Sequence, residues 1–440
     1  MQQISITLGD LPRLSNRRLG ELGALIRPAA DRTSLRALGS RFVVSPPGFP
    51  TMLITHEIDD VREVFTNTED FSVGQLLSRV ANHDRVFGRE TLVFLEGEEH
   101  RRERRLFAPP FQNKALRSYE DMMVEVARRE LPNWPVGEPV EFVGIGYDLA
   151  LGVLLEVLFA DVPAQRRDRL TQAINQWVGA LQSVGFLVAS LLTPLLGGYT
   201  PPYPPLSRGA AAVDAVIIEE IAARRAAPGG DHTDMLSRYV GTELDQHDDA
   251  SLARNLRGIL LGGYETTAIT LGWIAVMLAA HPEALAELDA AVDSGDTPRL
   301  DAYLDAVIAE TVRLRPVSGF TGRRAARDTD LNGVRIPKGA IVIVPILAIQ
   351  ESLAHYPDPL AFRPERFLTD RPDSYTFLTF GAGPHRCLGA QFALLESRIL
   401  LRTILQSRRI APLPGPIEPP RRFHTGISPA HNARITLLPR

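Results

Sequence analysis

Cysteine is almost absent from this sequence, because Cys387 is the only one in 440 residues. A single thiol excludes an internal disulfide bond and any zinc or iron–sulfur site that takes four cysteines from the chain itself. Lysine is also scarce, and arginine supplies nearly all of the positive charge, which we attribute to coding bias. The net charge of -4 provides no general attraction to nucleic acid or to an acidic membrane surface.

Other features are missing as well. The first twenty residues contain no apolar run of the kind found in a signal peptide or a membrane anchor. We therefore expect a cytoplasmic protein with no transmembrane anchor. The chain also lacks internal repeats, long low-complexity linkers and a regular alternation of strand and helix patterns, which argues against a doubly wound α/β fold. We expect a mainly α fold with small β-sheets and a single domain over residues 1–440, in which residues 1–40 are an unassigned N-terminal extension without a usable motif.

Helical patterns dominate what is present. Residues 41–67 have the pattern of a strand, a turn, a second strand and a helix. A short, very basic helix is expected from 98 to 106, where a proline pair stops it. Helical apolar spacing recurs at 117–129 and 144–159, and the Asn-Gly pair at 332–333 predicts a β-hairpin.

The longest predicted helix begins near Asp249 and ends before Pro282. About thirty residues at about 1.5 Å each span roughly 45 Å, enough to cross a whole domain. The stretch "GGYETT" at 262–267 is expected to break the centre of this helix, because two interior glycines cost about 1 kcal/mol each relative to alanine. Burial of Glu265 within this helix also needs a reason. One interpretation is a close-packing site between helices with a solvated glutamate.

The single cysteine lies in the stretch "FGAGPHRCLGA", directly before another helical pattern. Its glycines permit positive φ angles and let a flat ligand approach the backbone. A helix N-terminus places free N–H groups and the positive end of the helix dipole beside the sulfur, and both favour a thiolate. A thiolate on such a loop suits a soft metal such as iron. Three alternatives stay open: a small buried hydrophobe, a phosphate-binding loop, and a catalytic pair of Cys387 with His385.

These motifs resemble those of the cytochrome P-450 family, the cysteine-thiolate haem monooxygenases, and in particular its soluble bacterial type. The stretch "FGAGPHRCLG" fits F-x-x-G-x-[HR]-x-C-x-G, and "GGYETT" fits [AG]-G-x-[DE]-T. The shorter "ETVR" fits E-x-x-R, and "HRRER" fits [WH]-x-x-x-R. The resemblance extends from about Arg41 to the C-terminus. It implies the triangular fold of that family with its long central helix, haem b as cofactor and O₂ as co-substrate.

The resemblance also implies a role for each motif residue. Cys387 is then the axial iron ligand, and Glu265 with Thr266 relays protons to the bound dioxygen. The other residues implied to bind the haem are His385, Arg323, His100, Arg104, Phe380, Gly381, Gly389 and Gly263. A buried structural network is implied for Glu310, Arg313 and Arg366. The alternatives are a surface ion pair for this network and a solvated face for the basic run at 98–106.

The implied activity inserts one oxygen atom of O₂ into an apolar organic substrate and reduces the other to water. No flavin or nicotinamide domain is recognisable, so electrons are expected from a separate ferredoxin and its reductase. Two alternatives remain, a haem sensor or carrier, and a peroxide-driven or rearranging enzyme of the same fold. The Glu265–Thr266 pair argues against both, because only O₂ activation needs a proton relay.

The substrate is expected to be apolar because residues 170–207 contain no charged side chain. This stretch has the length of a membrane span or of a core helix pair. By resemblance, however, it falls where the family has mobile lid helices over the substrate entrance. A terpenoid, steroid or fatty-acyl substrate is therefore expected. The expected pocket residues are Ile259, Leu260, Val317 and Phe320, and only Arg79 is placed to meet a carboxylate.

Overall fold

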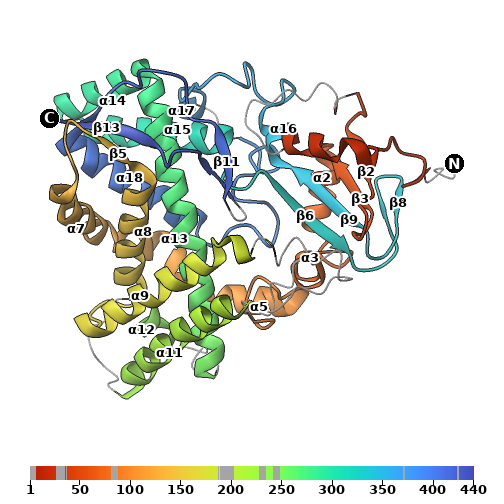
Figure 1. Ribbon diagram of the computed structural model, residues 1–440, viewed down its shortest axis with the longest axis horizontal. Helices are drawn as coiled ribbons and strands as arrows, with labels where there is room; N and C mark the ends of the chain where they lie inside the picture. Colours follow the sequence, from red (N-terminus) through yellow and green to blue (C-terminus); the bar gives the residue numbers. More distant parts are fainter. Residues whose placement is uncertain are drawn as a thin grey trace.

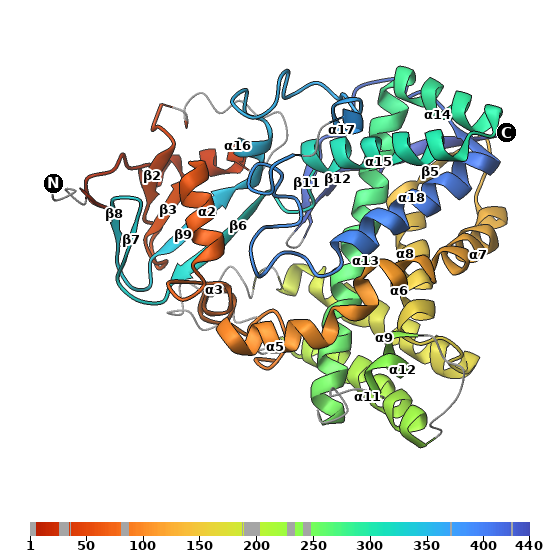
Figure 2. The same cartoon turned by 180° about the vertical axis from the view of Figure 1, so that it is seen from behind.

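The computed structural model describes residues 6–25, 35, 37–80, 88–186, 188, 203–226, 234–240, 248–369, 372–423 and 426–440. Its strands gather mainly on the side of the N-terminus, and most helices lie on the side of the C-terminus (Figure 1). The reverse view shows the same division, with α18 (Ala390–Ser407) crossing near the middle of α13 (Asp249–Ala280) (Figure 2). The expected mainly α fold with small sheets is confirmed.

Most of the chain is helical. The remaining α-helices are α2 (Ile58–Thr66), α3 (Val73–Val80), α5 (Gly97–Phe107), α6 (Asn113–Arg117), α7 (Glu120–Glu130), α8 (Phe142–Leu158), α9 (Ala164–Leu181), α11 (Pro204–Ala226), α12 (Met235–Val240), α14 (Pro282–Ser294), α15 (Thr297–Leu314), α16 (Ile346–Gln350) and α17 (Arg366–Thr369). Short 3-10 helices cover Asn16–Leu25, Pro109–Phe111 and Leu131–Asn133. The helices share one large apolar core, which α13 crosses. The sequence therefore predicted the helices at 98–106, 117–129 and 144–159 to within a few residues.

The largest sheet has five strands in the order β2-β3-β9-β6-β4. Its strands are β2 (Arg41–Val44), β3 (Met52–Thr55), β4 (Phe71–Ser72), β6 (Phe320–Ala325) and β9 (Ile341–Pro345). Three smaller sheets complete the described strands. The first contains β1 (Ile6–Thr7), β7 (Thr329–Leu331) and β8 (Val334–Ile336). The second contains β5 (Pro139–Glu141), β10 (Arg408–Ile410) and β13 (Arg434–Pro439), and the third pairs β11 (Pro420–Phe423) with β12 (Gly426–Pro429). The predicted hairpin is present, because Asn332 and Gly333 both have positive φ between β7 and β8.

The N-terminal residues belong to the sheet side. Strand β1 pairs in parallel with β8, and Arg13 forms an isolated bridge with Val43. Leu14 is buried in the small core over β2 and β3. The described residues among the first forty, for which the sequence offered no motif, thus contribute a short strand and core residues to the sheet side.

Helix α13 is continuous over 32 residues. Its N-cap Asp248 accepts a hydrogen bond from the backbone N–H of Ser251, which satisfies one of the free donors of the first turn. The expected interruption at the two glycines is wrong, because helical structure runs through them. Packing against α8, α11, α15 and α18 outweighs the low helix propensity of glycine. Among the described helices only α13 has the length and composition to cross a membrane, and most of it is buried inside the protein.

The uncharged stretch at 170–207 divides between two helices. Helix α9 ends at Leu181 and α11 begins at Pro204, and the two helices pack against each other. Residues 187 and 189–202 lie outside the described part of the chain. Within α9, Leu170, Ile174 and Trp177 are buried, while the opposite face is polar. The described part of this stretch is therefore an amphipathic helix rather than a uniformly apolar span.

Candidate active site

The cysteine lies at the end of a tight loop that leads into α18. Gly389 is the N-cap of α18, and the backbone N–H of Cys387 donates to the carbonyl oxygen of Phe380 at 2.8 Å. Gly381 and Gly383 adopt φ angles of 67° and 66°. A Cβ atom on Gly383 would lie 2.2 Å from the carbonyl oxygen of Phe65, which no real side chain tolerates. The loop conformation therefore depends on glycine for steric reasons.

The environment of the thiol shifts the pKa of Cys387 in two opposing directions. Burial raises the pKa of Cys387, although the residue is exposed to solvent. The backbone N–H of Gly389 and the cations of Arg104 and Arg386 lower the same pKa, as expected at a helix N-terminus, but by less. The backbone N–H at the start of α18 therefore favours the thiolate as predicted, but without a bound metal burial has the larger effect. A bound metal cation would supply the missing stabilisation.

Two arginines near this loop are partly or fully buried without a carboxylate partner. Arg323 on β6 is only 3% exposed, its Nη1 donates to Gly322 O at 2.8 Å, and its Nε has no hydrogen-bond partner. Burial lowers its pKa to about 10. Burial also lowers the pKa of Arg104 on α5, and no ion pair of Arg104 is found within the described residues. Buried guanidinium groups of this kind need an anion.

Two histidines stack beside the same loop. The ring centroids of His100 on α5 and His385 are 3.9 Å apart. His385 Nε2 lies 3.0 Å from Oε2 of Glu96, which also accepts hydrogen bonds through Oε1 from Ser72 Oγ and the backbone N–H of Gly74. Burial, together with the smaller effects of the neighbouring His385 and Arg104, lowers the pKa of His100 to about 4. His100 is therefore neutral at pH 7.

The middle of α13 exposes a narrow face. No atom lies within 4 Å of the Cβ position of Gly262, and Thr266 is exposed although the helix is otherwise largely buried. The Thr266 hydroxyl donates to the carbonyl oxygen of Gly262, while the neighbouring Glu265 is buried. A Cβ atom at Gly263 would lie 3.0 Å from the side chain of Leu154 on α8. Gly263 serves helix packing, and Gly262 borders the open space.

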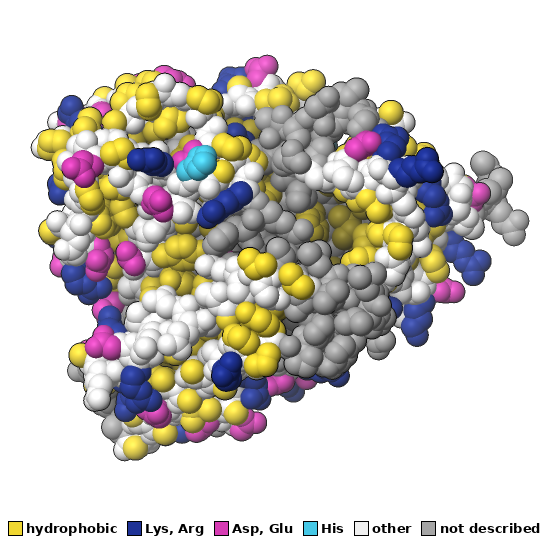
Figure 3. Space-filling model, in the orientation of Figure 1, with side chains coloured by type: hydrophobic (Ala, Val, Ile, Leu, Met, Phe, Trp, Pro, Cys, Tyr) yellow, Lys and Arg dark blue, Asp and Glu magenta, His cyan; other side chains and the backbone are white. Residues whose placement is uncertain are grey.

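The expected substrate pocket is only partly brought together. Ile259 and Val317 are partly buried, and Phe320 is 42% exposed. Leu260 does not line the expected pocket. It is 1% exposed and lies in the large helical core, on the face of α13 opposite to Gly262. The side chain of Arg79 lies outside the described part of the structure. A hollow lined by hydrophobic side chains is visible on the face between the helices and the sheet (Figure 3).

The Glu310–Arg313 pair lies in the interior of the protein. Both side chains are 0% exposed, and Nε and Nη2 of Arg313 donate to the two carboxylate oxygens at 2.7 and 2.8 Å. Nε of Arg366 donates to Oε1 of Glu310 at 3.1 Å. The three residues implied by the resemblance are therefore in contact, and the pair is not a surface ion pair.

Two buried residues escaped the sequence analysis. Gln350 accepts hydrogen bonds from Leu378 N at 2.8 Å and from Thr379 Oγ1 at 3.2 Å, so it connects Arg313 to the segment before Phe380. Glu396 on α18 is fully buried, and its Oε2 lies 3.4 Å from Thr267 Oγ1 of α13. The sequence did offer a signal for Glu396, because a carboxylate interrupts the apolar pattern of its helix. It offered no signal for Gln350, because a single glutamine forms no recognisable pattern.

These residues fit a haem. A flat, dianionic iron ligand requires a cysteine exposed to solvent, an open face such as that of Gly262 and Thr266 on α13, and cations for its propionates. Among the described residues, the buried Arg323 and the partly buried Arg104 form no ion pair and can supply these cations. Cys387 would bind the iron, and Arg104 and Arg323 would bind the propionates. His100 and His385 lie beside this position, with Glu96 already bound to His385.

Comparison with known proteins agrees with this site. Residues 39–434 match the family described as cytochrome P-450. Cytochrome P-450 137 of Mycobacterium tuberculosis is 34% identical over 350 residues, which cover 78% of this chain and 72% of that protein. Cytochrome P-450 135B1 of Mycobacterium bovis is 32% identical over 413 residues, covering 91% and 85%. The fold resembles that of the retinoic acid-bound cyanobacterial CYP120A1, with a TM-score of 0.76 at 22% identity over 100% of this chain and 98% of that chain. From the site and these relatives together, we conclude that the chain belongs to the cytochrome P-450 family of haem-thiolate monooxygenases, which use haem and O₂.

Proposed function

We propose that this monooxygenase hydroxylates or otherwise oxidises an apolar organic substrate of the terpenoid, steroid or fatty-acyl type. The observation that carries the proposal is the exposed face at the middle of α13. There Thr266 presents a hydroxyl next to the open side of Gly262, and the partly exposed Ile259 lies one turn before them. A substrate held against this face would meet a hydroxyl and hydrocarbon but no charged group.

Each site residue has a proposed task. Cys387 Sγ binds the iron, and the guanidinium groups of Arg104 and Arg323 hold the propionates. When bound, the haem supplies the oxygen activation that no side chain can provide. The Thr266 hydroxyl both donates and accepts hydrogen bonds, so it passes protons into the site from the carboxyl group of Glu265. Phe380, Gly381 and Gly389 keep the loop in the conformation that presents Cys387.

The substrate class follows from what surrounds the face. The hollow in Figure 3 is lined by hydrophobic side chains, and Phe320 and Val317 are apolar neighbours at the start of β6. At about 25 cal/mol per Å², burial of a few hundred Å² of hydrocarbon contributes several kcal/mol without a polar contact. Helices α9 and α11 would form the lid over this substrate.

Electrons are proposed to come from a separate ferredoxin and ferredoxin reductase. The described helices and sheets all belong to the haem-binding fold, and the single free cysteine cannot hold an iron–sulfur cluster. We also propose the cytoplasm as the compartment, because a free thiol that serves as an iron ligand is best preserved under reducing conditions.

The substrate class is tested by spin-state titration of the haem-loaded protein. Limonene, progesterone and palmitate serve as probes of the three apolar classes, and glucose and adenosine serve as polar controls. We expect a low-spin to high-spin shift at micromolar concentration with at least one apolar probe and with neither control. A shift only with glucose or adenosine would contradict the proposed substrate class.

The proton role of Thr266 is tested with Thr266→Ala. Loss of the hydroxyl should leave probe binding within about threefold of the parent, because binding is apolar, but divert most consumed electrons to hydrogen peroxide. Thr66→Ala is the matched control, because Thr66 is also an exposed helical threonine that donates to the carbonyl four residues earlier. The comparison requires product and peroxide per reduced nicotinamide consumed. Full coupling in Thr266→Ala would remove Thr266 from the mechanism.

A further inference from the structure

Helices α9 and α11 form an antiparallel pair beside α13 (Figure 1). At one end of the pair, Nη2 of Arg169 on α9 donates to Glu219 of α11 at 2.6 Å. At the other end, Ser183 Oγ donates to the Tyr203 hydroxyl at 2.9 Å, so the two helices are joined at both ends. We call the first end the base (residues 164–169 and 214–226) and the second end the tip (residues 175–186 and 203–207).

Ion pairs fasten the base to the rest of the protein. Nη1 of Arg167 donates to Oε1 of Glu156 on α8 at 2.8 Å. Arg224 is 7% exposed, and its Nη1 donates to Oδ2 of Asp234, just before α12, at 2.5 Å. Hydrogen bonds between charged groups are roughly twice as strong as neutral ones. The base is therefore firmly held by the body of the protein.

The tip has no charged side chain with which to form an ion pair, because residues 170–207 contain none. Along α11, the described ion pair closest to the tip joins Asp214 in the base to Arg257 of α13 at 2.6 Å. The uncharged stretch thus divides the helix pair into a base that is held by ion pairs and a tip that depends on neutral contacts.

Two tyrosines outside the helix pair hold the tip through neutral hydrogen bonds. Tyr264 of α13 is 6% exposed, and its hydroxyl donates to Oδ1 of Asn175 at 3.0 Å. Nε2 of Gln182 donates to the hydroxyl of Tyr147 on α8 at 3.4 Å. Burial raises the pKa of Tyr264 to about 12 and that of Tyr147 above its usual range, so both hydroxyls are neutral at pH 7. We call these two hydrogen bonds the latch.

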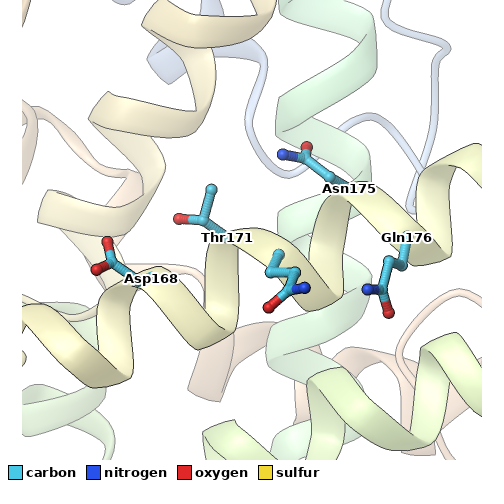
Figure 4. Close-up of a pocket in the computed structure, with 5 residues that line it drawn as sticks. Asp168, Thr171, Asn175 and Gln176 are labelled. Carbon is cyan, nitrogen blue, oxygen red and sulfur yellow. The ribbon is translucent and has the colours of Figure 1, made fainter.

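Solvent reaches one of the two latch bonds. Asn175 is exposed and belongs to a polar surface pocket of about 530 Å³ on α9 (Figure 4). The other residues that line this pocket are Asp168, Thr171, Gln172 and Gln176. Water in the pocket can replace Tyr264 as the hydrogen-bond donor to Asn175, and such an exchange of partners changes the free energy little. The latch is therefore suited to repeated opening and closing.

We propose that α9 and α11 open as one body, with the charged base as the hinge and the latch holding the neutral tip closed. The inference rests on the proposed role of these helices as the lid over the substrate. Opening breaks the two neutral hydrogen bonds of the latch and keeps the ion pairs of the base. The latch therefore sets how fast a bulky ligand enters and leaves the site.

Binding of phenylimidazole to the ferric haem-loaded protein measures this opening without turnover. Phenylimidazole binds iron directly and is bulky, whereas cyanide has only two atoms and serves as the small control ligand. In Tyr264→Phe, stopped-flow absorption should show that the association and dissociation rates of phenylimidazole both rise by about threefold to tenfold, as expected for the loss of one neutral hydrogen bond. The Kd should stay within about twofold, because entry and exit share the same open state. The cyanide rates should not change.

Further variants separate the latch from general effects on the fold. Asn175→Leu removes the acceptor on the lid and should act like Tyr264→Phe, whereas Asn175→Asp retains an acceptor oxygen and should open no faster than the parent. Tyr303→Phe is the matched control, because Tyr303 is a buried helical tyrosine that donates to a side chain elsewhere, Glu365. Glu156→Gln weakens the base but leaves the latch closed, so it should not accelerate phenylimidazole binding.

Three results would contradict the proposal. Unchanged phenylimidazole rates in both Tyr264→Phe and Asn175→Leu would overturn the latch, and so would an equal acceleration of cyanide. Acceleration in Glu156→Gln as large as in Tyr264→Phe would overturn the base as the hinge. Phenylimidazole binds the iron whatever the natural substrate is. If its rates change as expected while no apolar probe shifts the spin state, the proposed substrate class fails and the latch stands.

Discussion

At the scale of single residues, the chemistry of the site depends on groups whose charges the protein alone does not settle. Burial raises the pKa of Cys387 and leaves Arg323 without an anion in the described structure. A bound iron ion would stabilise the thiolate, and the propionates would neutralise the arginines. Haem binding thus resolves two unfavourable features at once, and we expect the protein without haem to be markedly less stable.

The role of Cys387 gives the first residue-scale prediction. In Cys387→His the iron should acquire an imidazole nitrogen as its ligand. Imidazole is neutral and donates less electron density to the iron than a thiolate does. The ferrous–CO complex of the parent should show the red-shifted absorption of thiolate ligation, and the variant should lose it. An unchanged spectrum in a variant that still holds haem would contradict the assignment of Cys387.

Glu396 gives a second prediction at this scale. It is fully buried, Thr267 is its only hydrogen-bond partner among the described residues, and burial raises its pKa well above the usual value. Above the ordinary pKa of glutamate the unfolded chain loses this proton while the folded protein keeps it. Stability therefore falls as pH rises from about 4.5 towards the folded pKa, by about 1 kcal/mol per pH unit for one proton.

Glu396→Gln removes this titration while retaining the shape of the side chain. We expect the variant to unfold at the same or higher urea concentration than the parent at pH 7, with an advantage that shrinks towards pH 5. Urea titrations at several pH values measure the difference. A variant advantage that is constant over pH 5–7 would show that Glu396 carries no extra proton in the folded state.

At the scale of elements, a chain of buried contacts ties α15 to the cysteine loop. Arg313 on α15 donates to the carbonyl oxygens of Gln350 and Pro359 at 2.6 and 2.8 Å, in addition to its ion pair. Gln350 in turn holds the segment at 378–379, which directly precedes the loop. Helix α15 also contacts this segment directly, because Thr379 Oγ1 donates to the carbonyl oxygen of Val312 at 2.7 Å. The loop is therefore positioned by α15 and α16 together.

Removal of one partner tests this bracing. Glu310→Ala leaves the guanidinium of Arg313 buried without its carboxylate, which costs about 3–5 kcal/mol. The variant should therefore show low haem content and a lower unfolding midpoint. Glu125→Ala is the matched control, because Glu125 and Arg128 form an exposed pair with the same spacing of three residues on α7. Its loss should cost less than about 1 kcal/mol. Equal stability and haem content in the two variants would exclude a bracing role.

At the scale of the whole molecule, the basic residues near the cysteine are largely neutralised. Arg101 and Arg105 pair with Glu98, and Arg398 and Arg402 pair with Asp305 and Asp301 on α15. Arg386, directly before Cys387, is exposed and has no ion pair in the described structure. An acidic ferredoxin should therefore be attracted most strongly close to the loop itself.

This charge pattern predicts a specific salt dependence. Reduction by an acidic ferredoxin should slow as ionic strength rises, because exposed charges are screened. Arg386→Gln should lower the low-salt rate severalfold, and Arg402→Gln should lower it less because Asp301 already offsets its charge. Stopped-flow formation of the ferrous–CO complex measures the rate. Rates that do not respond to salt would exclude electrostatic docking.

The sequence by itself determined the features that depend on local chemistry. The glycines around Cys387, the Asn-Gly hairpin and the proline and aspartate boundaries of α5 and α13 follow from backbone sterics and capping, which neighbouring residues settle. Helical periodicity likewise predicted the long α13 and the spacing of Glu310 and Arg313. These patterns were sufficient to indicate the family and its cofactor.

Only the tertiary structure decided which side of each element is used. Leu260 and Gly263 had apolar or small side chains suited to the site, yet packing against α8 and the large core turns them away from Gly262 and Thr266. The net shift in the pKa of Cys387 could not be determined from the sequence either. Burial of the thiol depends on contacts between segments far apart in the chain. The link from Asn175 to Tyr264 spans 89 positions in sequence. No local pattern encodes such a contact, since it arises only when α9 packs over α13.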